Sequence, residues 1–151
     1  MALENEIKQQ SFKSEDQKGV INIIYTYHWI TERVKDFLAS EKITHQQFNI
    51  LRILRGSEPT PLSTLTIRER MLDKMSDTSR IVDRMVIKGL VTKRLCAMDK
   101  RLVDVSLTQE GKKLLSRLDK RNCEMEQIMS NLTKSDLETL NGLLDKLRSA
   151  D

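Results

Sequence analysis

The stretch from residue 76 to residue 111, SDTSRIVDRMVIKGLVTKRLCAMDKRLVDVSLTQEG, constrains the fold more than any other part of this chain. Its first half repeats core-compatible side chains at intervals of three and four residues, namely Thr78, Ile81, Val82 and Met85. That spacing places them on one inward face of an amphipathic helix. By the same spacing, the opposite face carries the polar side chains of Ser76, Asp77, Arg80 and Arg84.

A hairpin is expected directly after this helix. Gly89 is suited to end the helix, because glycine adopts a left-handed backbone without a Cβ clash. A strand-like run starts at Val91, and residues 103–107 alternate apolar with polar side chains, which is the period of a half-buried strand. Thr108 then fits the N-cap of another helix. This order describes a recognition helix followed by a β-wing, which can read one DNA groove and touch the neighbouring backbone or minor groove.

Three segments in this region resemble the MarR family of dimeric winged helix-turn-helix transcription regulators. They are SRIVDRM at 79–85, KGLV at 88–91, and DKRLVDVSLTQEG at 99–111. The third segment resembles the family's Asp-x-Arg wing tip followed by a Val-x-Leu-Thr-x-x-Gly junction between strand and helix. The resemblance covers nearly the whole chain, and it implies a fold that is mainly α with a small β-wing (α+β).

The charge distribution agrees with a nucleic-acid partner. The chain has 151 residues, the size of one domain, with a formal net charge of +4. Residues 68–101 contain ten Lys and Arg against five Asp and Glu. A solvated charged surface would give the same count. The basic charge indicates a nucleic-acid partner because it coincides with the predicted helix and wing.

Other functional classes are not expected. We find no run of apolar residues that suits a membrane span and no signal-peptide pattern, and Cys96 and Cys123 lack metal-type spacing. We therefore expect a cytoplasmic protein with no metal and no cofactor. Catalytic triads, paired carboxylates and glycine-rich phosphate loops are also missing from the sequence, so an enzyme is not expected.

Caps and periodicity divide the single domain (1–151) into predicted helices. A long helix is expected over 17–39, and Thr44 with Gln47 forms a capping box for the next one. Thr66 with Glu69 suggests another capping box, and Asp73 is a candidate cap for the recognition helix. A continuous helix is expected over about 109–130. A last helix, capped by Thr133 and Asp136, bears a leucine row at positions 137, 140, 144 and 147.

The long helices at the two ends predict a symmetric partner. Their apolar faces are larger than one small core can cover, and a second copy of the chain would bury them. In the resembled family the terminal helices form the dimer interface. We therefore assign 17–39 and 109–149 to dimerisation and 44–108 to the winged helix-turn-helix lobe.

The predicted DNA-binding residues lie on the helix and the wing. Arg80 is the first candidate for base readout, because a guanidinium can bond guanine O6 and N7 together. Asp77 either accepts from a cytosine amino group or restrains Arg80 three residues away. The resemblance implies that Arg101 contacts the minor groove and that Asp99 orients it. The remaining candidates for phosphate, base or backbone contacts are Lys74, Ser76, Ser79, Arg84, Lys93, Arg94 and Lys100.

One aromatic cluster suggests either packing or a ligand pocket. Tyr25, Tyr27, His28 and Trp29 bury area at a helix interface, or they line a pocket for a small aromatic effector between the dimer helices and the lobe. The resembled family often binds such effectors.

The sequence therefore predicts a homodimeric repressor that binds an inverted-repeat operator in double-stranded DNA and is released by a small-molecule effector. Two alternatives remain open. One is a redox switch acting through Cys96, and the other is a protein-interaction module that does not use DNA.

Overall fold

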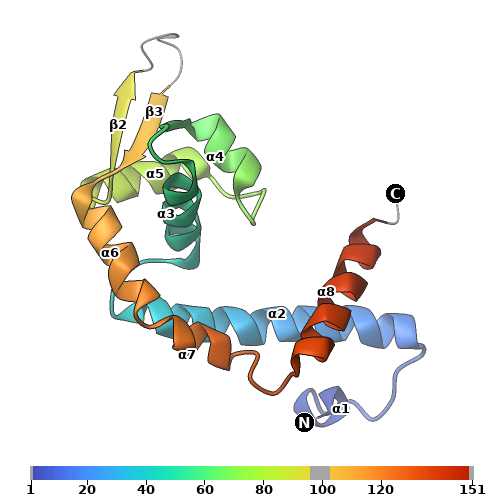
Figure 1. Ribbon diagram of the computed structural model, residues 1–151. Coiled ribbons are helices and arrows are strands. Elements are labelled where there is room, and N and C mark those ends of the chain that lie inside the picture. The colour runs from blue at the N-terminus through green and yellow to red at the C-terminus, as the bar shows by residue number, and fades with distance from the viewer. Residues whose placement is uncertain (1, 96–102, 150–151) are drawn as a thin grey trace.

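The structure, a computed structural model, describes residues 2–95 and 103–149 (Figure 1). It is mostly helical with one small antiparallel sheet, which confirms the predicted fold class. In chain order the elements are α1 (Leu3–Glu6), α2 (Glu15–Ala39), α3 (His45–Ser57), β1 (Leu62–Ser63), α4 (Thr64–Arg70), α5 (Thr78–Ile87), β2 (Val91–Leu95), β3 (Val103–Leu107), α6 (Gln109–Asp119), α7 (Asn122–Gln127) and α8 (Lys134–Arg148).

One lobe contains α3, α4 and α5 packed against the three strands (Figure 1). The sheet has the order β1-β3-β2, and both pairings are antiparallel, with Leu62 opposite Val105 and Val91 opposite Leu107. The fully buried side chains of this core come from every layer, and they include Ile50, Leu51, Ile67, Val82, Met85, Val91, Val105 and Leu115. The core therefore fixes α5 against the hairpin and against α6.

The junction between α5, β2 and α6 is held by backbone hydrogen bonds. Gly89 has a φ of +71°, and its N–H donates to the carbonyl of Val86 while the N–H of Leu90 donates to that of Met85. This bond pair is the Schellman motif, so the predicted glycine stop is confirmed. Thr108 caps α6 as predicted, and its hydroxyl also donates to the Gly89 carbonyl at 2.7 Å.

Two other predicted caps are confirmed and one is wrong. The capping boxes of α3, at Thr44, and α8, at Thr133, are both present. The capping box expected at Thr66 is absent, because α4 begins at Thr64 and Ser63 accepts from the N–H of Thr66. The helix starts earlier because β1, which pairs with β3, ends at Ser63 and leaves no linker before it.

The predicted continuous helix over 109–130 is also wrong. It breaks after Asp119, and α7 begins at Asn122. At the break, Arg121 donates to the Ser40 hydroxyl at the end of α2 (2.7 Å) and to both carboxylate oxygens of Glu124 (2.6 and 2.7 Å). The chain thus changes direction where it leaves the lobe and reaches α2.

A second ion pair joins α6 to the loop between α2 and α3. Arg117 donates to both carboxylate oxygens of Glu41, at 2.8 to 3.2 Å. These bonds hold the pKa of the Glu41 carboxyl below its usual value, so the pair stays ionised at neutral pH. Together with the contacts of Arg121, they fix the end of α2 to the lobe.

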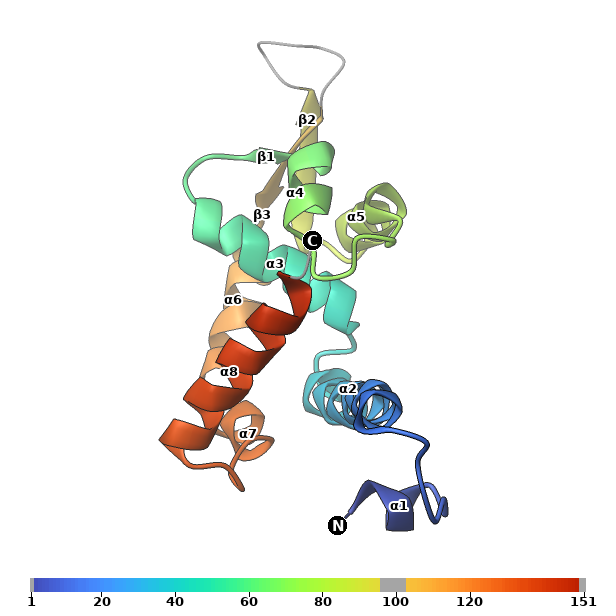
Figure 2. The ribbon, with the colours of Figure 1, turned by 90° about the vertical axis from the view of Figure 1, so that its right-hand side faces the viewer.

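The apolar faces of α2 and α8 are uncovered in the single chain. Helix α8 crosses α2 in Figure 1, but Figure 2 shows that the two helices lie apart. No residue of α8 is buried, and Leu143 and Leu147 are 61% and 60% exposed. Exposed apolar side chains on α2 include Val20, Ile23, Ile24 and Tyr27. The sequence predicted apolar faces too large for one small core to cover, and the single chain leaves them exposed.

Within residues 2–95 and 103–149, no helix has the length and apolar character needed to cross a membrane.

Candidate nucleic-acid interface

Helix α5 presents a polar face to solvent. Its inward residues, Thr78, Val82 and Met85, are buried as predicted. Arg80 and Arg84 are exposed on the other face, and neither forms an ion pair with any residue that the structure describes. Two guanidinium groups one helical turn apart are therefore available to an external partner.

Asp77 has a role that was only partly anticipated. It is the N-cap of α5, and its carboxylate accepts from the backbone N–H of Arg80 at 3.2 Å. The predicted relation between these two residues exists, but it runs through the backbone of Arg80. The cap fixes the first turn of α5 and, with it, the starting position of the Arg80 side chain.

The recognition helix begins later than predicted. Asp73 caps a turn, accepting from the N–H of Met75, and α5 starts only at Thr78. Lys74 is exposed in this turn, and its ammonium donates to the Glu69 carbonyl. Ser76 was expected on the exposed face, but it is buried, and its hydroxyl donates to the Asp73 carbonyl at 2.8 Å. As placed, Ser76 supports the turn from inside.

The base of the wing lies beside α5. Lys93 on β2 forms an ion pair with Asp83 on α5, so its ammonium is engaged within the lobe. Arg94 is exposed and stands opposite Asp104 in the strand register. The wing-tip residues Asp99, Lys100 and Arg101, and also Cys96, lie outside the described residues.

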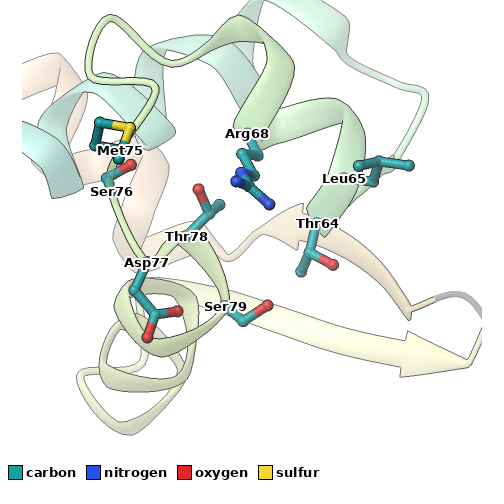
Figure 3. Close-up of a pocket in the computed structure, with 8 residues that line it drawn as sticks. All are labelled: Thr64, Leu65, Arg68, Met75, Ser76, Asp77, Thr78 and Ser79. Atoms are coloured by element: carbon teal, nitrogen blue, oxygen red, sulfur yellow. The ribbon is translucent and has the colours of Figure 1, made fainter.

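A cavity of about 390 Å³ opens at the start of α5 (Figure 3). It lies between this helix and α4, the first helix of the helix-turn-helix. Ser79 lines it, as do two residues that the sequence analysis missed, Thr64 and Arg68. These two are four residues apart on α4, on a face adjacent to that of the buried Ile67. Helical spacing around Ile67 is the signal that would have found them.

A larger cavity, of about 600 Å³, separates α2 from the lobe. Its volume is in the range of small-molecule sites. Four regions contribute to its wall: α2, α3, the turn between α4 and α5, and α7. The lining residues are Tyr27, Ile30, Thr31, Val34, His45, Gln46, Phe48, Asn49, Arg52, Met71, Leu72, Asp73 and Met125.

Of the four predicted pocket aromatics, only Tyr27 lines this cavity. Tyr25 donates its hydroxyl to Glu6 at 2.9 Å, and Trp29 stacks under the Arg33 guanidinium at 3.5 Å. His28 packs edge-on against Tyr27 outside the lining. These three do not line this cavity, because consecutive residues of a helix point in directions about 100° apart.

Comparison with known proteins agrees with the fold. Residues 43–103 match the family model described as MarR family. The transcriptional regulator PapX of Escherichia coli is 27% identical over 119 residues, which are 78% of this chain and 73% of PapX. These matches include the helix-turn-helix and the start of the hairpin.

Solved structures share the architecture. A mutant MarR of E. coli, complexed with operator DNA, has a TM-score of 0.79 at 23% identity, over 97% of this chain and 99% of that one. BpsR of Bordetella bronchiseptica, from a study of how 6-hydroxynicotinic acid regulates its DNA binding, has a TM-score of 0.76 at 17% identity, over 87% of this chain and 99% of that one. The matches agree with the sequence motifs and the winged fold: this chain is similar to the MarR family over residues 43–103 and has the fold of solved MarR transcription regulators.

Proposed function

We propose that this protein regulates transcription by binding double-stranded DNA with α5 in the major groove. The observation that supports this most directly is the exposed face of α5, where Arg80 and Arg84 lack ion-pair partners among the described residues. The β2–β3 hairpin lies beside α5, and the ion pair between Lys93 and Asp83 joins the two. A guanidinium on such a helix bonds guanine edges, and a flanking hairpin reaches the neighbouring backbone.

The deciding experiment is selection of bound sequences from random duplex DNA by the purified protein. We expect an enriched inverted repeat whose half-sites lie about 34 Å apart, since two recognition helices related by a twofold axis meet successive major grooves. Affinity should also fall steeply with salt. A protein that enriches no sequence, and binds no duplex at low salt, would instead fit a protein-interaction module.

The same proposal includes a homodimer formed through α2 and α8. The apolar side chains left exposed on these helices are the surface that a second copy would bury. The dimer would act as a repressor where it competes with polymerase for the same duplex.

We expect the substitution Leu147→Glu in α8 to weaken dimerisation by about 30-fold or more, because it places a charge in the apolar contact. Sedimentation equilibrium should give twice the 17.5 kDa chain mass for the parent and a lighter species for the variant. Ser135→Glu, exposed in the first turn of the same helix, is the matched control and should remain dimeric. A parent that sediments as a monomer at micromolar concentration would contradict the dimer.

An effector would act from the 600 Å³ cavity, whose wall joins α2 to the turn before α5. A ligand that favours one arrangement of these parts changes the distance between the two recognition helices of a dimer. The lining is largely apolar and aromatic, with Arg52 as a cationic group that suits a carboxylate. BpsR, whose DNA binding is regulated by 6-hydroxynicotinic acid, offers a probe of this chemistry.

The substitution Arg52→Gln should therefore reduce the response to a small aromatic acid about tenfold, since a charge-assisted bond is lost, without changing DNA affinity in its absence. The measurement is release of operator DNA as 6-hydroxynicotinic acid and related aromatic acids are titrated. Arg33→Gln, whose guanidinium stacks on Trp29 away from the cavity, is the control. Equal responses of parent and Arg52 variant would exclude this residue from the site.

A further inference from the structure

We propose that the cavity at the start of α5 binds a phosphate group of the DNA backbone through Arg68 and the hydroxyl of Thr78. The inference rests on the proposed function and adds a contact that the sequence did not indicate. Figure 3 shows the Thr78 side chain rising from the first turn of α5 toward the Arg68 guanidinium. The hydroxyls of Thr64 and Ser79 border the same space.

The first argument is an unpartnered hydroxyl. Thr78 is only 3% exposed, and its Oγ1 has no hydrogen-bond partner among the described residues. The other buried polar side chains are satisfied: Gln47 completes the capping box of α3, and Ser76 bonds the Asp73 carbonyl. Burying a hydroxyl without a partner is unfavourable, so an orphan in a cavity wall indicates a missing ligand.

The second argument is electrostatic. Arg68 is exposed in the last turn of α4, and within the described part of the chain no carboxylate pairs with it. The cavity also lies at the N-terminus of α5, where backbone N–H groups and the helix dipole favour an anion. Asp77 also lines the cavity, but its carboxylate points away from Arg68 in Figure 3 and accepts from the Arg80 N–H.

The third argument selects the source of the phosphate. In a helix-turn-helix, the first helix crosses the DNA backbone while the second enters the major groove. Arg68 belongs to that first helix, and Ser79, which lines the cavity, directly precedes Arg80 on the second. A backbone phosphate beside the base read by Arg80 therefore arrives at the cavity when α5 docks. The proposal requires the exposed Arg68 side chain to turn so that the phosphate reaches the buried hydroxyl.

The test uses Thr78→Val, which removes the hydroxyl and keeps the shape. Operator affinity of the full-length protein should fall about tenfold, as for a lost bond to a charged group. The melting temperature should stay equal or rise, because an unsatisfied buried hydroxyl has been replaced by a methyl group. A hydroxyl with a purely structural role would give the opposite result, with lower stability and unchanged affinity.

A second variant, Arg68→Gln, should also weaken binding about tenfold and reduce the slope of log affinity against log salt by about one. Arg70→Gln, in the same turn of α4 but outside the cavity lining, is the charge-matched control. It should change the operator affinity and the salt slope less than Arg68→Gln does. Ethylation interference should show one phosphate whose modification blocks the parent protein but no longer affects either cavity variant.

The outcomes separate this inference from the proposed function. If both cavity variants keep parental affinity and salt slope while Arg80→Ala weakens binding, the phosphate site is wrong and DNA binding stands. A different result would be that inorganic phosphate raises the melting temperature of the parent but not of Arg68→Gln, while both cavity variants keep the operator affinity of the parent. The cavity would then bind a free anion, and its assignment to a DNA backbone phosphate would be overturned. A parent protein that binds no duplex overturns both.

Discussion

Replacing Gly111 with alanine is expected to destabilise the protein by about 2–4 kcal/mol, the range of severe overpacking. A Cβ at this position would lie 2.3 Å from the carbonyl oxygen of Leu90 and 3.3 Å from its carbonyl carbon. The backbone of Leu90 has no room to move away from this Cβ. Leu90 is buried, its carbonyl accepts from the Thr108 N–H, and its own N–H is bonded to Met85. Urea unfolding at fixed protein concentration measures the loss.

Gly56→Ala provides the matched control. Gly56 also lies in a helix, α3, but its Cβ would meet nothing within 4 Å. The same substitution there should leave stability unchanged or raise it by up to about 1 kcal/mol, as alanine favours helix more than glycine does. An unfolding free energy for Gly111→Ala within about 0.5 kcal/mol of the parent would contradict the close contact between α6 and Leu90.

Arg80→Ala is expected to lower operator affinity by about 1–3 kcal/mol, or roughly 5- to 150-fold, and to relax preference at one base pair. The Asp77 cap holds the first turn of α5, and Arg80 is exposed directly after it. The guanidinium is therefore attached to an ordered backbone, so little backbone conformational entropy is lost when it bonds a base. Binding to the selected operator and to single-base variants of it measures both effects.

The control for Arg80 is Arg148→Ala, which removes the same charge at the end of α8, where Arg148 pairs with Asp145. Affinity should change little with this variant. Should Arg80→Ala bind every single-base variant with the parental order of preference, Arg80 would be a phosphate contact and base readout would belong to another side chain.

Sequence reasoning succeeded where structure depends on neighbouring residues. The capping boxes of α3 and α8, the Gly89 stop and the Thr108 cap each need only a side chain and the backbone within a few residues. The inward face of α5 was correct for the same reason, since periodicity alone separates Val82 and Met85 from Arg80 and Arg84.

It failed where distant contacts choose between equivalent local options. Asp73 and Asp77 are both good N-caps, and α5 starts at the second. The turn before it is held instead by Asn49, whose side-chain oxygen accepts from the Leu72 N–H across 23 positions. The break between α6 and α7 depends likewise on the bond of Arg121 to Ser40.

The candidate site was predicted in part. The arginines of α5 follow from periodicity, but the two cavities are formed by helices that are not adjacent in the sequence. Arg68 and Thr64 become binding candidates only once α4 is seen beside the start of α5 (Figure 3). Of the aromatic cluster on α2, only Tyr27 lines the larger cavity, because the orientation of the lobe decides which side of that helix faces it.

The ion pair between Lys93 and Asp83 has a consequence for how a duplex is fitted. Together with the hydrogen bond from Thr108 to Gly89, it links the hairpin to the recognition helix. The two elements therefore change their orientation on DNA together. In a complex of the kind proposed, any mismatch in groove width must then be absorbed by bending or twisting the DNA. Flexible pyrimidine–purine steps between the half-sites should accordingly influence affinity at base pairs that no side chain touches.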